Sequence, residues 1–206
     1  MSRCVIIGGA AIGDYAYVKK HLNNDDFYVF CDSGLKHLSA LGVKPCLVVG
    51  DFDSHEDPLL QVETITLPCE KDDTDTMFAL KEGIKRGFED FLLIGVVGER
   101  FDHTMGNVSM LMYLDSRDKR GVLIDDYSQM SVVSSEVSFV EDEYSYFSLL
   151  NITGLAKGVT IENAKYPLCD SEIGCEYQYG ISNEVIKGKT AKISVKEGRL
   201  LLVKVR

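Results

Sequence analysis

The chain has 206 residues, 45% of them hydrophobic, and is long enough to bury a core as one domain or two small ones. Its formal net charge of -10 argues against binding to nucleic acid or an anionic membrane, because both partners favour clustered Lys and Arg. No run approaches the ~20 apolar residues that cross a bilayer, and the glycine-broken N-terminus lacks a secretory pattern. We therefore expect a cytoplasmic globular protein that binds small molecules or metal ions.

From residue 1 to 125, apolar runs alternate with amphipathic stretches, which is the pattern of βα units around a mostly parallel sheet. The expected strands cover residues 4–7, 27–31, 46–49, 63–67, 91–96 and 122–124, and the expected helices cover 15–22, 35–41, 76–86 and 104–119. After residue 126, runs rich in Val, Ser, Tyr and Phe at 130–140, 144–150, 158–162, 190–195 and 200–205 predict a smaller antiparallel β-sandwich. The sequence thus predicts an α/β domain over 1–125 and a β-sandwich domain over 126–206.

The six cysteines show no C-x-x-C spacing. Cys4, Cys31 and Cys46 fall in apolar runs, which indicates buried, reduced thiols. Cys169 and Cys175 are expected to share a loop, where they could form a disulfide or a metal pair.

Acidic residues gather just after the expected strands, where an open α/β sheet binds its ligands. Asp51 and Asp53 follow the third strand, and alternation points both carboxylates to one side with Phe52 on the other. Two carboxylates at this spacing could share a hard cation, or they could belong to a solvated turn.

A second acidic segment, residues 70–75, follows the fourth expected strand and precedes a helix. Asp73 or Thr74 could serve only as the N-cap of that helix. Carboxylates from both segments at one edge of the sheet would repel each other unless a cation lies between them. The two segments together therefore favour a metal site.

Residues 98–103 (Gly-Glu-Arg-Phe-Asp-His) follow the fifth strand and open another helix. Arg100 offers a planar donor fork suited to phosphate oxygens, whereas Asp102 could be only the helix cap and His103 only a first-turn residue. Glycine turns at 8–9 and 33–34 add to this pattern, and the chain has no G-x-x-x-x-G-K-[ST] loop. The chemistry indicated is metal-assisted phosphoryl-type transfer outside the P-loop class.

The first 34 residues also allow a nicotinamide-dependent oxidoreductase. Gly8-x-Ala10-x-x-Gly13 follows the first strand, and Asp32 ends the second, where a ribose-binding acid would stand. In this alternative, however, Ala10 replaces the middle glycine, and the carboxylates of residues 51–75 have no role.

In their order and spacing these motifs resemble the thiamine pyrophosphokinase (thiamine diphosphokinase) family. Residues 31–34 resemble its ADGG-type turn, residues 50–54 its GDFDS motif and residues 71–75 its KDxTD motif. Residues 98–107 resemble its GGRxDH…N motif, and residues 165–168 with 180–184 resemble its KYPL…SNE pair. Ser33 and Glu99 stand where the family has glycine, and both bear on how closely the backbone can approach a nucleotide.

The resemblance implies Mg²⁺-dependent transfer of a pyrophosphoryl group from ATP to the hydroxyl of thiamine, giving thiamine diphosphate and AMP. It implies an α/β domain, a β-sandwich and a homodimer with thiamine near the subunit interface. The implied Mg²⁺ ligands are Asp51, Asp53, Asp72 and Asp75, and the implied catalytic residues are Asp53, Asp75 and Arg100. The implied nucleotide contacts are Gly9, Asp32, Gly34, Asp51, Thr74, Arg100, Asp102 and Asn107.

Thiamine contacts are implied for Tyr166, Ser182 and Asn183. The ring of Tyr166 could offer its face to the cationic heterocycle, or it could be a core side chain. Asp75 or Asp53 could accept the alcohol proton, although a carboxylate bound to Mg²⁺ is a poor base. Besides the nicotinamide enzyme, two alternatives stay open: the same chemistry on another small alcohol such as a pterin, and a non-catalytic thiamine or nucleotide sensor.

Overall fold

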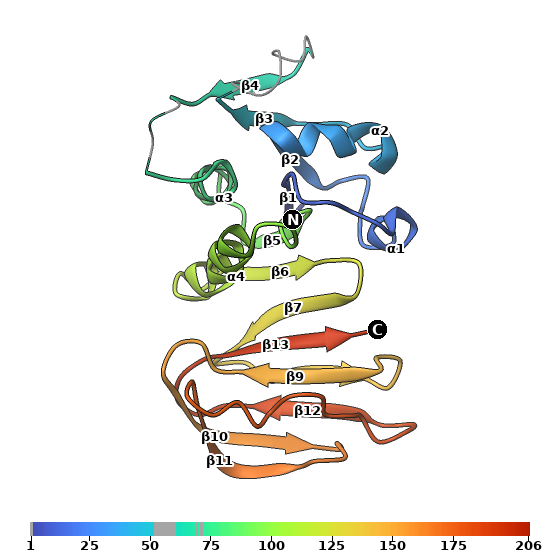
Figure 1. Ribbon diagram of the computed structural model, residues 1–206, viewed down its shortest axis with the longest axis vertical. Helices are drawn as coiled ribbons and strands as arrows, with labels where there is room; N and C mark the ends of the chain where they lie inside the picture. The colour runs from blue at the N-terminus through green and yellow to red at the C-terminus, as the bar shows by residue number, and fades with distance from the viewer. Residues whose placement is uncertain (1, 52–60, 69, 71) are drawn as a thin grey trace. The chain divides into compact units, whose positions relative to one another are not determined.

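The computed structural model of the chain describes residues 2–51, 61–68, 70 and 72–206. Within these ranges no helix is long and apolar enough to span a membrane. The chain divides into two compact units, Met1–Asp126 and Tyr127–Arg206. Their helices and strands are labelled in Figure 1.

The first unit contains a parallel sheet. Its strands are β1 (Cys4–Ile7), β2 (Phe27–Cys31), β3 (Leu47–Gly50), β4 (Glu63–Thr66), β5 (Asp90–Ile94) and β6 (Arg120–Ile124), in the spatial order β4-β3-β2-β1-β5-β6. Every pairing between these neighbours is parallel. The central strands are continuous apolar runs because both of their faces are buried. The mostly parallel α/β sheet predicted from the sequence is confirmed.

Helices cover both faces of this sheet. They are α1 (Tyr15–Lys19), the 3-10 segment η1 (Asp32–His37), α2 (Leu38–Leu41), α3 (Asp75–Lys85) and α4 (Phe101–Asp115). Val5 and Ile7 point into a buried cluster shared with side chains of α1, η1 and α2. On the other face, α3 lies so close that a Cβ on Gly83 would be 2.7 Å from the ring of Phe91. Figure 1 shows α3 and α4 on one side of the strands and α1 and α2 on the other.

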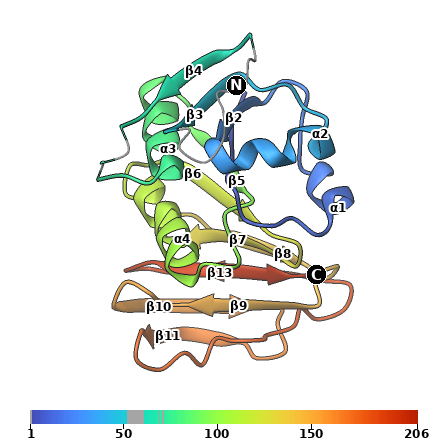
Figure 2. The same ribbon diagram turned by 45° about the horizontal axis from the view of Figure 1, so that its top comes forward.

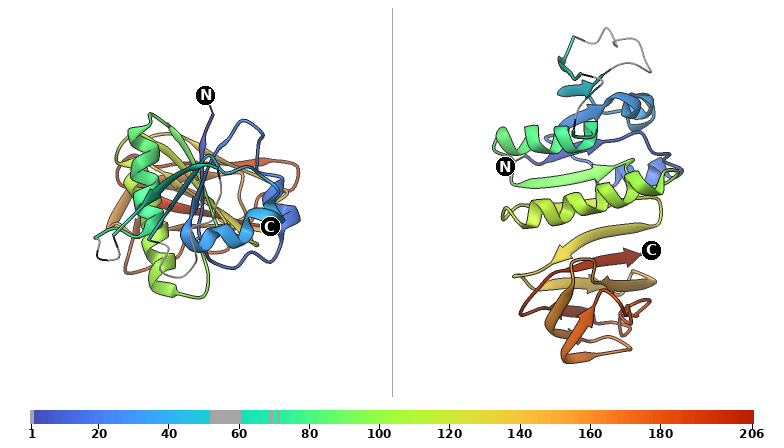
Figure 3. Two further views of the ribbon diagram at one scale, coloured as in Figure 1. Left: turned by 90° about the horizontal axis from the view of Figure 1, so that it is seen from above. Right: turned by 60° about the vertical axis from the view of Figure 1, so that its left-hand side comes forward.

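The second unit contains two antiparallel sheets, shown from further directions in Figures 2 and 3. The strands β7 (Ser128–Val133), β13 (Leu200–Val205) and β9 (Tyr146–Leu150) pair in that order. The strands β11 (Leu168–Gly174), β10 (Leu155–Glu162), β12 (Thr190–Ser194) and β8 (Ser138–Glu141) form the other sheet. Side chains from both sheets, including Phe147 and Ile193, share one core. The predicted antiparallel β-sandwich is therefore confirmed.

Several expectations about single elements were wrong. Residues 35–41 are divided between η1 and α2, and the run 130–140 holds two strands, β7 and β8. Cys169 lies within β11 instead of a loop, and it and Cys175 are exposed, free thiols that form no disulfide. In the edge strand β11 every residue except Ile173 is at least partly exposed, so no apolar periodicity marks it in the sequence. Cys4 and Cys31 are buried as predicted, but Cys46 is only half-buried.

Candidate active site

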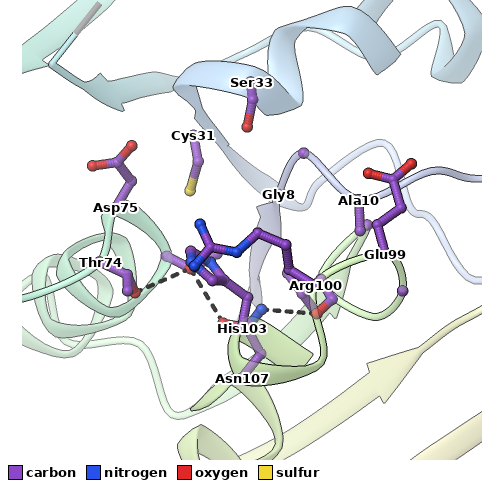
Figure 4. A pocket seen from close by; sticks show the side chains of 15 residues that line it. Gly8, Ala10, Cys31, Ser33, Thr74, Asp75, Glu99, Arg100, His103 and Asn107 are labelled. Atoms are coloured by element: carbon purple, nitrogen blue, oxygen red, sulfur yellow. Dashed lines mark hydrogen bonds between the residues drawn. The ribbon is translucent and has the colours of Figure 1, made fainter. Parts of the chain in front are cut away.

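The strand order of the first unit reverses between β1 and β5, and ligands of open α/β sheets bind at such reversals, beyond the carboxyl ends of the strands. The loops that leave these two strands run side by side. Gly8 donates its N–H to the Ile94 oxygen (2.9 Å), and Ala10 donates to the Gly95 oxygen (2.8 Å). A cavity of about 260 Å³ opens here (Figure 4), lined by Gly8, Gly9, Ala10, Cys31, Ser33, Thr74, Asp75, Thr76, Gly95, Val96, Gly98, Glu99, Arg100, His103 and Asn107.

Glycines let the segments around this cavity approach each other at backbone distance. A Cβ on Gly8 would lie only 2.6 Å from the Gly95 oxygen, and one on Gly34 would collide with the Ile7 carbonyl. A Cβ on Gly9 would overlap the side chain of Ser33. Serine fits at position 33 because residue 9 is a glycine and has no side chain. Glycine backbone therefore forms part of this wall, and a wall without side chains lets a ligand approach the main chain closely.

Thr74 is the N-cap of α3, one of the two N-cap candidates in the sequence. Its Oγ1 accepts a hydrogen bond from the Met77 N–H (3.2 Å) and lies 3.3 Å from Thr76 Oγ1. Thr76 donates to Asn107 Oδ1 (3.3 Å), and Asn107 Nδ2 donates to the Val96 oxygen (2.7 Å). Hydrogen bonds thus link the start of α3, helix α4 and the end of β5 across the cavity (Figure 4).

Arg100 precedes α4 as its N-cap residue, and its side chain extends into the cavity (Figure 4). Its Nε and Nη2 donate to the two oxygens of Asp102, at 3.2 and 2.5 Å. Hydrogen bonds from Arg100 lower the pKa of Asp102 below its ordinary value, so the carboxylate stays charged. Asp102 therefore lies in the first turn, where it orients Arg100, and is not the helix cap. Among the described residues Nη1 of Arg100 has no hydrogen-bond partner.

The negative charges of the cavity are separated. Figure 4 shows the carboxylates of Asp75, at the start of α3, and Glu99, after β5, at opposite ends. Glu99 adopts a left-handed backbone conformation with φ of 30°, and Gly98 before it has φ of 130°. The left-handed turn suits the glycine that the family pattern has at position 99 better than it suits glutamate.

In the second unit, Tyr166 is 60% exposed, which excludes the core interpretation of its side chain. Lys165 Nζ lies 5.7 Å from the Tyr166 ring centroid. Asn183 is buried, and its amide bonds the backbone of Tyr166 in both directions: Oδ1 accepts from the N–H (3.0 Å), and Nδ2 donates to the oxygen (2.8 Å). Ser182 has φ of 57° and donates its N–H to Ser148 Oγ (3.0 Å). Asn183 thus fixes the segment that presents Tyr166.

Two family models match this chain. The catalytic domain of thiamin pyrophosphokinase matches residues 18–123, and the vitamin B1 binding domain of thiamin pyrophosphokinase matches residues 134–200. The chain belongs to the thiamin pyrophosphokinase family. The family predicted from the sequence motifs is confirmed.

Relatives agree with this assignment. The chain is 26% identical over 185 residues to the thiamine pyrophosphokinase of Bacillus subtilis (strain 168), which covers 86% of each protein. The crystal structure of the B. subtilis thiamine pyrophosphokinase has the same fold, with a TM-score of 0.85 and 24% identity over 99% of both chains. The thiamin pyrophosphokinase structure from Geobacillus thermodenitrificans has a TM-score of 0.84 and 26% identity, covering 98% of this chain and 97% of the other. None of these matches favours a pterin or nicotinamide enzyme.

The loop after β1 gives a physical reason against the nicotinamide alternative. In a dinucleotide site, the N–H groups at the third glycine and the helix that follows face a pyrophosphate. Here the Gly13 and Asp14 N–H groups donate to the two carboxylate oxygens of Asp126, at 2.8 and 2.9 Å. An internal carboxylate therefore occupies the donors that a dinucleotide would need.

The family motifs contribute unequally to the cavity. Of the residues predicted to bind nucleotide or metal, those in its wall are Gly9, Thr74, Asp75, Arg100 and Asn107. Others that the structure describes lie outside the wall, namely Asp32, Gly34, Asp51, Asp72 and Asp102. Asp32 follows β2, and Asp51 follows the neighbouring strand β3. Asp32 is buried and packs against Gly50, the residue before Asp51.

The predicted metal site is described only in part. Asp53 and Phe52 lie outside the described residues, and the described part of the chain contains no cluster of three or more His, Cys, Asp or Glu side chains placed to hold a metal. The remaining predicted ligands, Asp51, Asp72 and Asp75, supply carboxylate oxygens, which are the donors that hard divalent cations prefer. Their chemistry fits such a cation, and the ligand set stays a prediction.

Two polar wall residues, Thr76 and His103, had only a structural role in the expectations from the sequence. Thr76 was expected only to begin a helix, but it lines the cavity, and its hydroxyl lies 3.3 Å from that of Thr74. His103 was interpreted as a first-turn residue, yet the first turn of α4 faces the cavity.

Proposed function

We propose that this chain is a thiamine diphosphokinase that transfers the pyrophosphoryl group of ATP to the primary hydroxyl of thiamine and releases AMP. The observation that carries the proposal is the match to both domains of one family, catalytic and vitamin B1 binding. The glycine-walled cavity at the reversal of the sheet supports it, because such positions bind nucleotides. Family membership implies ATP and a divalent cation, and we propose Mg²⁺ as that cation.

The cavity residues are proposed to hold the phosphates of ATP. Gly9 and Thr74 bring backbone N–H groups close, Thr74 at the positive end of α3, and Arg100 offers Nη1 while Asp102 holds its other edge. Asp32, Gly34 and Asp51 are proposed to complete the nucleotide site from the ends of β2 and β3. The role of Gly34 is to let η1 pack against the end of β1.

The carboxylates Asp51, Asp53, Asp72 and Asp75 are proposed to hold Mg²⁺. When bound, Mg²⁺ would offset the negative charge of the phosphates. With Asp75 and Glu99 both in the cavity wall, a polyanionic substrate requires such charge compensation in addition to Arg100.

Catalysis is proposed to consist of positioning and charge stabilisation, with the thiamine hydroxyl attacking the β-phosphorus in line. Arg100 stabilises charge on the transferred group. Asp75 or Asp53 is the candidate to accept the hydroxyl proton, although coordination of Mg²⁺ would weaken either carboxylate as a base. No covalent enzyme intermediate is needed.

Thiamine recognition is proposed for the second unit. The exposed ring of Tyr166 offers its face to the thiazolium, and Ser182 offers a hydroxyl. We propose that Asn183 acts by holding the Tyr166 backbone, since its amide is already bonded there. We further propose a cytoplasmic homodimer with thiamine near the subunit interface.

The test is incubation of the protein with ATP, Mg²⁺ and thiamine, followed by identification of the products. AMP and thiamine diphosphate are expected. ADP and thiamine monophosphate would show that the γ-phosphorus is attacked and that the proposed reaction is wrong. No turnover, with thiamine and ATP still bound, would instead favour a sensor.

A further inference from the structure

The cavity of the first unit is crossed by one chain of hydrogen bonds, and its direction follows from the chemistry of its members. The Val96 carbonyl only accepts, so the Asn107 amide must face it with Nδ2 (2.7 Å) and present Oδ1 to Thr76. Thr76 must then donate its single hydroxyl proton to Asn107 Oδ1 (3.3 Å). Thr74 is left as the donor to Thr76 (3.3 Å), while it accepts from the Met77 N–H.

This chain of hydrogen bonds connects three walls of the cavity. Thr74 and Thr76 belong to the start of α3, Asn107 to α4, and Val96 to the loop after β5. Val96 also touches the loop after β1, because a Cβ on Gly8 would lie 2.8 Å from Val96 Cγ1. The chain therefore sets the spacing between the walls that face a bound nucleotide.

Thr76 and Asn107 are suited to this role because both are buried. Thr76 is 9% exposed and Asn107 is 7% exposed, so water competes little for their hydrogen bonds. Removing the Thr76 hydroxyl would leave Asn107 Oδ1 without its donor and Thr74 without its acceptor. Buried polar groups that lose their partner are costly, and the local structure shifts to satisfy them.

We propose that Thr76 and Asn107 are positioning residues of the nucleotide site, which hold Thr74 and the Val96 loop at the spacing that the phosphates require. The inference rests on the proposed function, because it assumes that the cavity binds ATP. It changes the role of Asn107: its amide is used within the protein, and it acts on the nucleotide through Thr76, Thr74 and Val96.

The experiment is calorimetric titration of α,β-methylene-ATP with Mg²⁺ into wild type, Thr76→Val, Thr76→Ser and Asn107→Ala. Valine keeps the shape of threonine without the hydroxyl, and serine keeps the hydroxyl. We expect Kd to rise about threefold to tenfold in Thr76→Val and Asn107→Ala, and to stay within about twofold in Thr76→Ser. In steady-state assays Thr76→Val and Asn107→Ala should raise the KM for ATP and leave the KM for thiamine unchanged.

A double variant, Thr76→Val with Asn107→Ala, separates positioning from direct contact. If both residues act through one chain, the double variant should bind little worse than either single variant. Multiplied effects would mean that Asn107 contacts the nucleotide independently, and would overturn the inference.

The matched structural control is Asn151→Ala. Asn151 is a fully buried asparagine of the second unit whose Nδ2 also donates to a backbone oxygen, that of Ile173 (2.7 Å). This variant should lower the melting temperature without changing the Kd of the analogue. If Thr76→Val behaves like this control, Thr76 is merely structural and the inference fails. Should Asn107→Ala not fold, the two Thr76 variants decide alone. If wild type does not bind the analogue, the proposed function fails, and the inference fails with it.

Discussion

Tyr166→Ala should weaken thiamine binding while leaving the fold largely intact. Because the residue is 60% exposed, about 80 Å² of a residue of about 200 Å² is buried, and at ~25 cal/mol per Å² this is worth at most about 2 kcal/mol. A core aromatic residue would instead cost about 3–5 kcal/mol on truncation to alanine. The exposure of Tyr166 thus separates a binding role from a packing role.

The expected loss of thiamine affinity follows from the cationic ring of the ligand. A cation over an aromatic face gains about 0.5 to 2 kcal/mol, which corresponds to a rise in thiamine Kd of about 2-fold to 30-fold. Lys165 Nζ, 5.7 Å from the ring centroid, already shows a cation near this ring. Affinity for an unreactive ATP analogue should not change, because that analogue is assigned to the first unit.

The assay is calorimetric titration with thiamine and with the ATP analogue, beside a denaturant unfolding curve. Tyr166→Phe is the matched control, since it keeps the ring and should bind thiamine within about twofold of wild type. Unchanged thiamine binding by Tyr166→Ala would refute the assignment of its ring to the thiamine site. A loss of more than about 3 kcal/mol in the free energy of unfolding would refute the argument from exposure.

Four further substitutions test the first unit. Asp75→Asn should abolish turnover at saturating Mg²⁺ with a nearly unchanged melting curve, as should Asp53→Asn, and near-normal rates would exclude the metal assignment. Glu99→Gly should raise the free energy of unfolding by up to about 1 kcal/mol, because glycine suits φ of 30°, and should lower the KM for ATP by removing a carboxylate; a less stable variant would contradict this. Burial lowers the pKa of His37 from its ordinary 6.5, so the protein loses stability as pH falls below that value. Denaturant unfolding between about pH 5 and 8 should show a smaller loss of unfolding free energy with falling pH in His37→Gln than in the protein that keeps His37. His21, whose pKa is lowered in the same direction, is replaced in both proteins.

The sequence by itself determined two kinds of element: strands that are buried on both faces, and strands in which apolar and polar residues strictly alternate. The strands β1, β2 and β13 have the bounds expected from their apolar runs. Burial requires an apolar composition or an apolar period in such segments, and both can be recognised in the sequence before the fold is known. The sequence also located Thr74, Asp75 and Arg100, because the carboxyl ends of parallel strands meet at one edge of a sheet and each of these residues follows a strand.

Only the tertiary structure decided the elements and contacts whose partners lie far away in the chain. β11 exists because β10 offers it hydrogen bonds, and its exposed side chains carry no pattern of their own. Tyr166 has the same sequence context whether it is exposed or buried, and the Asn183 amide that holds its backbone lies 17 residues away in the chain. The hydrogen bond between Thr76 and Asn107 spans 31 residues. Local sequence fixes which donors and acceptors a segment carries, but the packing of distant segments decides which of them meet.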